Sequence, residues 1–260
     1  ASLSGDVAQL TSCDYLGIDG DNTISGSIAG LTSLTRIRIL GSNTVTGSVA
    51  ALTSLTYLYV TGSTTISGSV VGLTSLTFLT VGGTNTLTGS VAGLTSLTFI
   101  SVVGFNTLSG SVAALTSLSY LLSSGTNTLS GSIEGLTVCG TINVTGNNTL
   151  TGSITGMTSL ILLNVVGNNT LSGDISTITT GMSLVNLAGD NQMEVYTGGA
   201  TWEDISVTIK PAAGYGYDET EIDNLLIDMN DSSITGKPIT LTGSSAPRSS
   251  ASDTAKGEFQ

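Results

Sequence analysis

Few residues of this chain are suited to catalysis. The 260 residues include no histidine and two cysteines, Cys13 and Cys139. Without an imidazole the chain has no Ser-His or Cys-His pair that could activate a nucleophile. Two carboxylates about 5–10 Å apart can cleave a glycosidic bond, and Asp14, Asp19 and Asp21 come nearest to such a pair. We predict a protein that is not an enzyme, with a polysaccharide-cleaving protein as an alternative.

One acidic segment has the residue types of a metal site. Asp19-Gly20-Asp21-Asn22-Thr23 resembles the start of a calcium-binding loop. Ile24 occupies the sixth place, where that loop needs glycine, and no glutamate closes it. Asp19 and Asp21 are kept as candidate cation ligands, and we expect no resident metal and no cofactor.

The sharpest feature is a stripe of large side chains that recurs at a constant interval along the sequence. It holds Tyr15, Arg36, Tyr57, Phe78, Phe99 and Tyr120, with Arg38 and Tyr59 two places after members of the stripe. Neighbouring strands lie about 4.8 Å apart, close enough for rings to stack. An exposed row of rings forms an apolar patch, and such patches mark contact sites. We predict a binding face for a glycan, a receptor or another subunit; the alternative is that the rings only stiffen the sheet.

The stripe recurs because most of the chain is a repeat. Nine glycines mark its copies and set a 21-residue period: Gly5, Gly26, Gly47, Gly68, Gly89, Gly110, Gly131, Gly152 and Gly173. A fixed period of this length predicts a solenoid, in which each turn buries its apolar edge against its neighbours. Leu34, Ile37 and Ile39 alternate with exposed positions as a half-buried strand should, and Gly41 then allows a tight turn.

The residues after each strand predict how the turns are joined. Asparagine recurs there as Asn22, Asn43, Asn85, Asn106, Asn127, Asn148 and Asn169, with Thr64 as the exception. Stacked asparagines can bridge the backbones of adjacent turns. Val45, Val49 and Leu52 should then point into the core.

This pattern resembles the leucine-rich repeat. Asn43-x-Val45-x-Gly47-x-Val49-x-x-Leu52 is similar to the plant-type signature Asn-x-Leu-x-Gly-x-Ile-Pro, and this resemblance implies a second short strand on the return arm. It covers residues 1–193, but one extra residue precedes Asn43 and the proline is absent. The expected fold is a β-solenoid, a leucine-rich-repeat-like rod of about nine turns with a small α+β cap. A parallel β-helix is the alternative architecture.

Residues 194–260 are expected to form the cap over the last turn. Residues 202–210 read as a strand, residues 218–228 as a helix and residues 239–241 as a last strand. Ser252 or Asp253 could begin a second helix. The phrases at residues 225–228, 239–243 and 246–248 look like terminal segments of repeat proteins from bacteria and their phages.

Charge and cysteine usage limit the partners. The net charge is −12 with six Lys and Arg, which predicts no nucleic-acid binding. No run of 18 apolar residues is present, so we expect no membrane insertion. Cys13 and Cys139 replace the core leucine six repeats apart, too far for a disulfide, and both thiols should be buried. The Thr and Ser ladders, as at Thr44 and Ser48, could bind ice or sugars, as stacked Thr does in antifreeze β-solenoids; the alternative is solvated hydroxyls that satisfy turn backbone.

Together these features predict a non-enzymatic structural or recognition protein on an extracellular or virion surface. The first hypothesis is a phage virion component, such as a decoration, fibre or receptor-binding protein. Its partners would be further copies of the chain, other virion or surface proteins, or a host glycan or receptor. A secreted bacterial adhesin is the second hypothesis and a polysaccharide-cleaving β-solenoid the third.

Overall fold

The chain folds as a parallel β-solenoid. The structure is a computed structural model that describes residues 4–178, 181–202, 206–232, 239–241, 245–247 and 249–252. These residues form about ten turns with 21-residue spacing and one short α-helix near the C-terminus, which confirms the predicted fold class. The chain divides into two units, residues 1–130 and 131–260, and each is described by itself.

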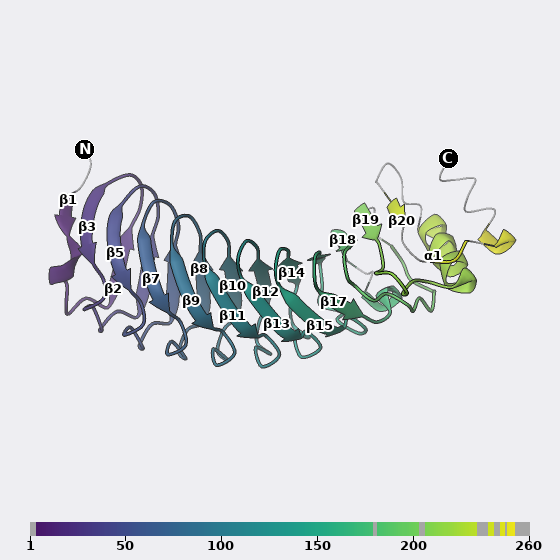
Figure 1. Cartoon of the computed structure of the whole chain (residues 1–260), viewed down its shortest axis with the longest axis horizontal. Helices are drawn as coiled ribbons and strands as arrows, with labels where there is room; N and C mark the ends of the chain where they lie inside the picture. Colours follow the sequence, from purple (N-terminus) through teal and green to yellow (C-terminus); the bar gives the residue numbers. More distant parts are fainter. Residues whose placement is uncertain are drawn as a thin grey trace. The chain divides into compact units, whose positions relative to one another are not determined.

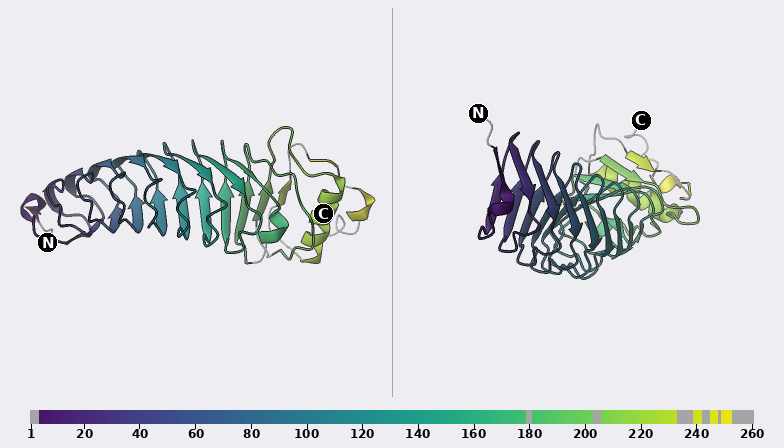
Figure 2. Two further views of the ribbon diagram at one scale, coloured as in Figure 1. Left: turned by 90° about the horizontal axis from the view of Figure 1, so that it is seen from below. Right: turned by 60° about the vertical axis from the view of Figure 1, so that its left-hand side comes forward.

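Every complete turn of unit 1 contributes one strand to each of two parallel sheets, seen as rungs in purple to teal (Figure 1, Figure 2). The main sheet follows the Leu-x-x-Leu-x-Val segment of each repeat. Its strands in unit 1 are β2 (Tyr15–Ile18), β4 (Arg36–Ile39), β6 (Tyr57–Val60), β8 (Phe78–Val81), β10 (Phe99–Val102) and β12 (Tyr120–Ser123). Neighbours in this sheet pair in a register equal to the repeat length, such as Tyr57 with Phe78. Equivalent side chains of successive repeats therefore form columns.

The return sheet confirms the second strand that the resemblance implied. In unit 1 it holds β1 (Ser4–Asp6), β3 (Thr23–Ser27), β5 (Thr44–Ser48), β7 (Thr65–Ser69), β9 (Thr86–Ser90), β11 (Thr107–Ser111) and the start of β13 (Thr128–Ser132); the short 3₁₀ helix η1 (Val7–Gln9) follows β1. The register here is shorter than the repeat, so that Thr46 pairs with Thr65 and Ser48 with Ser67. Equivalent residues of successive repeats are therefore offset by two places in this sheet and do not pair directly.

The core of unit 1 lies between the two sheets. Val45, Val49 and Leu52 are fully buried, as predicted, together with Leu55 and Leu58. Full burial of such a side chain contributes about 1.5–3 kcal/mol relative to exposure. Gly47 brings adjacent turns together, because its φ is +114° and an added Cβ would lie 2.5 Å from the Ser27 hydroxyl oxygen.

A column of buried asparagines, which we call the Asn column, joins the turns as predicted. In unit 1 the Asn106 side-chain oxygen accepts from the Leu87 N–H at 2.9 Å, and its amide donates to the Val103 carbonyl at 2.9 Å. Asn85 and Asn127 repeat both contacts. Each amide thus satisfies backbone groups of two turns that no strand partner reaches.

The exception, Thr64, is also buried. Its hydroxyl donates to the Asn85 side-chain oxygen at 3.0 Å. Threonine therefore fills the place in the Asn column, but its side chain has one polar group where asparagine has two.

Unit 2 continues both sheet types within itself. Its main-sheet strands are β14 (Thr141–Val144), β16 (Leu162–Val165), β18 (Leu184–Leu187), β19 (Ser206–Ile209) and β20 (Ile239–Leu241), and its return-sheet strands are β15 (Thr149–Ser153) and β17 (Thr170–Ser172). The 3₁₀ helix η2 (Ile175–Ile178) follows β17. β19 pairs in parallel with β18, and β20 pairs with β19. The main sheet therefore extends into the residues expected to cap it.

The helix predicted at residues 218–228 is α1 (Glu219–Asp231). Asp218 caps its first turn in a reciprocal pair of hydrogen bonds with Glu221, each 2.8 Å. Asp228 accepts from the Tyr196 hydroxyl at 2.8 Å, and Tyr196 in turn accepts from the indole N–H of Trp202 at 3.0 Å. These contacts attach the helix to the loop that precedes β19.

Two of the remaining predictions about the end of the chain are testable only in part. Of the strand predicted at residues 202–210, residues 203–205 lie outside the described part. The helix predicted to begin at Ser252 or Asp253 also lies largely outside it, and Ser252 ends the short 3₁₀ helix η3 (Ser250–Ser252). The division of the chain into residues 1–193 and 194–260 stays a prediction.

The two cysteines lie in different surroundings. Cys139 is fully buried, as predicted, and its sulfur donates to the Thr141 carbonyl at 3.2 Å. Cys13 is half-buried, so the prediction of burial is wrong there. It precedes the first main-sheet strand β2, where no earlier main-sheet strand of the described chain covers it.

Candidate binding face

The stripe of large residues forms a column of stacked rings on the outward side of the main sheet in unit 1. Ring centroids lie 4.4 Å apart for Tyr57 and Phe78, 4.5 Å for Phe78 and Phe99, and 4.4 Å for Phe99 and Tyr120. The planes within each pair differ by 12° or less. Tyr59 stacks more loosely on Phe78, at 6.2 Å. We call Tyr57, Phe78, Phe99 and Tyr120 the ring column.

This geometry decides which part of each ring is accessible. Neighbouring rings cover one another's faces, and all four side chains are half-buried. The outward surface of the column therefore consists of ring edges, together with the hydroxyls of Tyr57 and Tyr120. Aromatic edges carry partial positive charge and faces partial negative charge. The column is a narrow apolar strip and not a set of open ring faces.

Arg36 ends the ring column on its N-terminal side. Its guanidinium carbon lies 4.8 Å from the ring centre of Tyr57 and 5.7 Å from that of Tyr15. Both distances are within the range of a cation–π contact. Tyr15 reaches along its strand over Gly17, where an added Cβ would lie 2.5 Å from the tyrosine hydroxyl. An open hollow of about 390 Å³ is lined by Tyr15 and Arg36.

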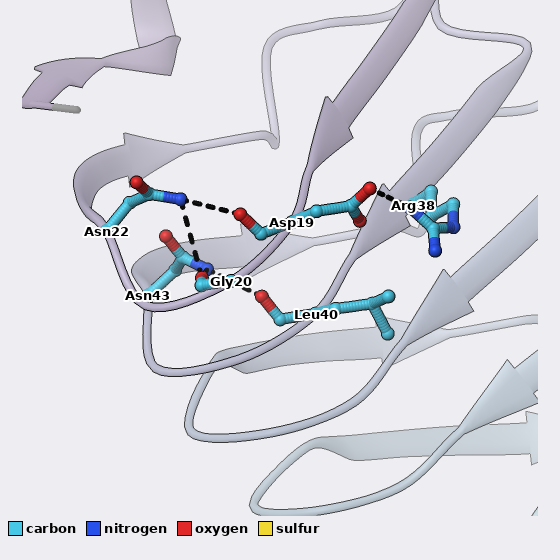
Figure 3. A network of polar contacts seen from close by, with 6 residues as sticks. All are labelled: Asp19, Gly20, Asn22, Arg38, Leu40 and Asn43. Carbon is cyan, nitrogen blue, oxygen red and sulfur yellow. Dashed lines mark hydrogen bonds and ion pairs between the residues drawn. The ribbon is translucent and has the colours of Figure 1, made fainter. Parts of the chain in front are cut away.

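The candidate cation ligands are engaged with other groups. Asp19 forms an ion pair with Arg38, which raises the pKa of the arginine (Figure 3). Asp21 accepts from the Ser42 N–H at 2.8 Å, and this hydrogen bond lowers the pKa of Asp21. Within the described part of the chain no three Cys, Asp or Glu side chains lie together as a metal site would require. The calcium interpretation stays a prediction, and this geometry gives it no support.

Asn22 and Asn43 hold the backbone of the same loop. The Asn22 amide donates to the Asp19 carbonyl at 2.8 Å, and the Asn43 amide donates to the Gly20 and Leu40 carbonyls at 3.1 and 2.9 Å (Figure 3). The acidic segment is thus shaped by the turn between strands. Its carboxylates contact the neighbouring turn: Asp19 pairs with the Arg38 guanidinium, and Asp21 accepts from the Ser42 N–H.

From residue 39 onward, unit 1 carries no charged side chain. Residues 39–130 contain no Asp, Glu, Lys, Arg or His, and the cations of residues 1–130 are Arg36 and Arg38. The return sheet of this stretch presents hydroxyls, but its shorter register sets Ser48 beside Ser67 and Ser67 beside Thr86. Threonine therefore does not stack on threonine throughout, as the ladder interpretation assumed.

In unit 2 the outward side of the main sheet has a different chemistry. Thr141 and Leu162 occupy the stripe position. Two places on, the Asn164 amide donates to the Asn143 side-chain oxygen, and the Asn186 amide donates to that of Asn164, each at 2.9 Å. This outward amide chain was missed in the sequence, although asparagines at the same place in successive repeats were a readable signal.

Solved structures share this architecture. A plant ice-binding protein has a TM-score of 0.51 with 22% identity, over 76% of this chain and 72% of that one. The LRR ectodomain of the receptor kinase GASSHO1/SCHENGEN3 from Arabidopsis thaliana matches with a TM-score of 0.45 and 18% identity, over 99% of this chain and 42% of that one. The likeness to the plant protein describes the fold of this chain, a leucine-rich-repeat-like β-solenoid.

The solenoid also matches an internalin, InlF from Listeria monocytogenes, with a TM-score of 0.45 and 17% identity over 92% of this chain and 83% of that one. No family model matches the sequence, and no curated protein matches it. At these identities the likeness describes the fold. In the described part of the chain no helix is long and apolar enough to span a membrane.

Proposed function

We propose that this protein is a non-enzymatic recognition protein of an extracellular or virion surface, and that the ring column of unit 1 contacts another copy of the chain. The observation that carries the proposal is the continuous strip of stacked rings on the outward side of the main sheet, at 4.4–4.5 Å spacing. A contiguous apolar patch of this kind on the solvent-exposed surface of a protein marks an interaction site.

The covered ring faces favour a protein partner over a glycan. A sugar ring that packs on an aromatic side chain needs an open ring face, whereas Phe78 and Phe99 offer edges. A second flat protein surface can pack against such edges along the whole strip. Tyrosine and phenylalanine are also among the residues enriched at protein interfaces.

The distribution of charge along the chain favours the ring column as the place where two identical copies meet. The protein has a net charge of −12, so two copies repel over much of their surface. Residues 39–130 carry no charge, and an interface in this stretch buries no unpaired ion. The uncharged stretch includes the whole ring column.

The more specific part of the proposal is that this surface belongs to a virion. It is supported by the resemblance of the C-terminal phrases to terminal segments of phage and bacterial repeat proteins. A secreted adhesin of the same build is the alternative setting. Polysaccharide cleavage gains no support, because Asp19 and Asp21 are held by Arg38 and Ser42. The ice binding named for the plant protein is not proposed for this chain, because its return sheet places serines among the threonines.

The native mass of the assembly tests the subunit contact. We expect an oligomer for the wild type and a monomer for Phe78→Thr/Phe99→Thr, because the strip is interrupted at its centre. Threonine is accepted in this row, since Thr141 occupies the equivalent place, and it suits a strand.

Phe105→Thr is the matched control. Phe105 is 68% exposed and lies outside the ring column, so the same chemical change there should leave the mass unchanged. A monomeric wild type at high concentration, or a double variant that still assembles, would show that the ring column is not a subunit contact.

A further inference from the structure

Arg36 is held in place before any partner arrives. Its guanidinium stacks between Tyr15 and Tyr57, with 5.7 and 4.8 Å to the two ring centres. Tyr15 can lie in this position because Gly17 leaves room beneath its hydroxyl. A long arginine side chain normally loses rotamer entropy when it binds a ligand. The two rings reduce that cost because they already restrict Arg36.

The guanidinium N–H groups of Arg36 are not used by the described neighbours, whereas its backbone N–H donates to the Asp14 carbonyl. Among the residues that the structure describes, no hydrogen bond or ion pair to the Arg36 guanidinium is found, and the residue is exposed beside the hollow. Arg38, two places on, is already paired with Asp19. A guanidinium presents five N–H donors in a planar fork that matches a carboxylate.

The surrounding charges leave Arg36 as the open cation of this face. The acidic residues of unit 1 are Asp6, Asp14, Asp19 and Asp21, and residues 39–130 add no further charge. The Asp19 carboxylate, which comes from the neighbouring strand region, is bound to Arg38. An incoming carboxylate at Arg36 would therefore meet a positive group at the edge of an uncharged strip.

We propose that Arg36, framed by Tyr15 and Tyr57, is a carboxylate-binding site, filled in the assembly by an acidic side chain of a second copy of the chain. Each copy carries 18 Asp and Glu against six Lys and Arg, so carboxylates are abundant on the partner. The source of the carboxylate rests on the proposed subunit contact. The site itself rests on the geometry of Arg36 and can be tested without assembly.

The first experiment detects the site directly by NMR. The chain has three arginines, so three side-chain Nε–H resonances are expected, and Arg36→Gln identifies the one that belongs to Arg36. We expect this resonance to shift when acetyl-Glu-Glu-Glu-amide is added, and to stay in place with the matching glutamine peptide. Added salt should reverse the shift, because exposed charges are screened.

Two variants distinguish the contribution of the planar guanidinium donors to peptide binding from that of the positive charge. Arg36→Lys keeps the charge but not the planar donors, and we expect at least tenfold weaker peptide binding. Gly17→Thr leaves Arg36 intact but displaces Tyr15, and we expect several-fold weaker binding. Lys210→Gln removes the same charge from an exposed position of unit 2 and should bind the peptide as the wild type does. If the peptide leaves the Arg36 resonance unmoved, the site does not exist.

The second experiment tests whether a second copy of the chain or another molecule supplies the carboxylate. We expect Arg36→Gln to raise the dissociation constant of the assembly at least tenfold, and Lys210→Gln to change it less than twofold. Assembly of Arg36→Gln at the wild-type concentration would overturn a second copy as the source. Tighter binding of a galacturonate trimer than of the glutamate peptide would overturn a protein source altogether.

The two proposals fail in different ways. If Phe78→Thr/Phe99→Thr assembles as the wild type does while the glutamate peptide still shifts the Arg36 resonance, the ring-column contact is wrong and the carboxylate site stands. If the double variant is monomeric but the peptide has no effect, the contact stands and the carboxylate site is wrong.

Discussion

Unit 1 contains two side-chain columns made by the same repeat, one facing inward and one facing outward. The Asn column places a buried amide at nearly every turn, and each amide bonds to backbone groups of two turns. The ring column lies on the outward side of the main sheet and bonds to no backbone; its members contact one another. Repetition produced both columns, but only the inward one satisfies the backbone.

The difference shows where the chain is free to vary. In the inward column the one replacement, Thr64, is another small polar residue. In the outward row the residues range from Tyr15 and Arg36 to Thr141 and Leu162. A position that the fold does not need can carry residues for recognition, so the outward row is where we place function.

Asn106→Ala should have the largest effect on stability. It removes the acceptor of the buried Leu87 N–H and the donor to the part-buried Val103 carbonyl. A buried backbone group left without a partner costs about 1–3 kcal/mol, so we expect a loss of about 3 kcal/mol in the free energy of unfolding. Urea unfolding followed by circular dichroism measures it.

The neighbouring exposed residue provides the control for this substitution. Phe105→Ala should change the free energy of unfolding by less than about 0.5 kcal/mol, as is usual for exposed positions. If Asn106→Ala costs no more than Phe105→Ala, the inward column is not what holds the turns together.

Phe99→Thr should have a smaller effect on stability. It removes two ring contacts, with Phe78 at 4.5 Å and with Tyr120 at 4.4 Å, each worth about 0.5–1.5 kcal/mol. Threonine keeps the strand propensity, so we expect a loss of about 1–2 kcal/mol in the same urea experiment. Tyr120→Phe retains the stack and should be neutral. A loss for Phe99→Thr that equals that of Asn106→Ala would mean that the outward column is structural.

Thr64→Asn should have the smallest effect and the opposite sign. By comparison with Asn85, the new amide would donate to the Thr61 carbonyl and accept from the Val45 N–H, at the cost of the Thr64 hydroxyl bond to Asn85. One additional hydrogen bond is worth about 1 kcal/mol. We expect the urea midpoint to rise accordingly. A lower midpoint would show that this turn has adapted to threonine.

The sequence predicted the features that follow directly from the repeat. The solenoid, the buried Val45 and Leu52 and the bridging asparagines could all be read from spacing, because an inward side chain recurs where the backbone or core requires it. The members of the ring column were also predicted. That the rings could stack followed from the strand spacing, but their exposure could not be read, because the half-burial of Phe78 depends on how closely its neighbours cover its two faces.

The register of the return sheet was a second feature that the sequence did not reveal. Thr44 recurs once in each repeat, but strand pairing depends on how far each return arm slides against the next, and Ser48 meets Ser67. The contact of Arg36 with two rings was likewise hidden. It depends on Gly17, two places after Tyr15, whose missing side chain makes room for the tyrosine.

In the main sheet of unit 1 the register equals the length of the repeat. A gene that gained or lost one repeat's worth of coding sequence would therefore bring each side chain of the main sheet onto an equivalent partner. Duplication could lengthen the ring column by one member without a new kind of contact. The reach of the recognition strip can thus be adjusted by copying, separately from the chemistry of its end at Arg36.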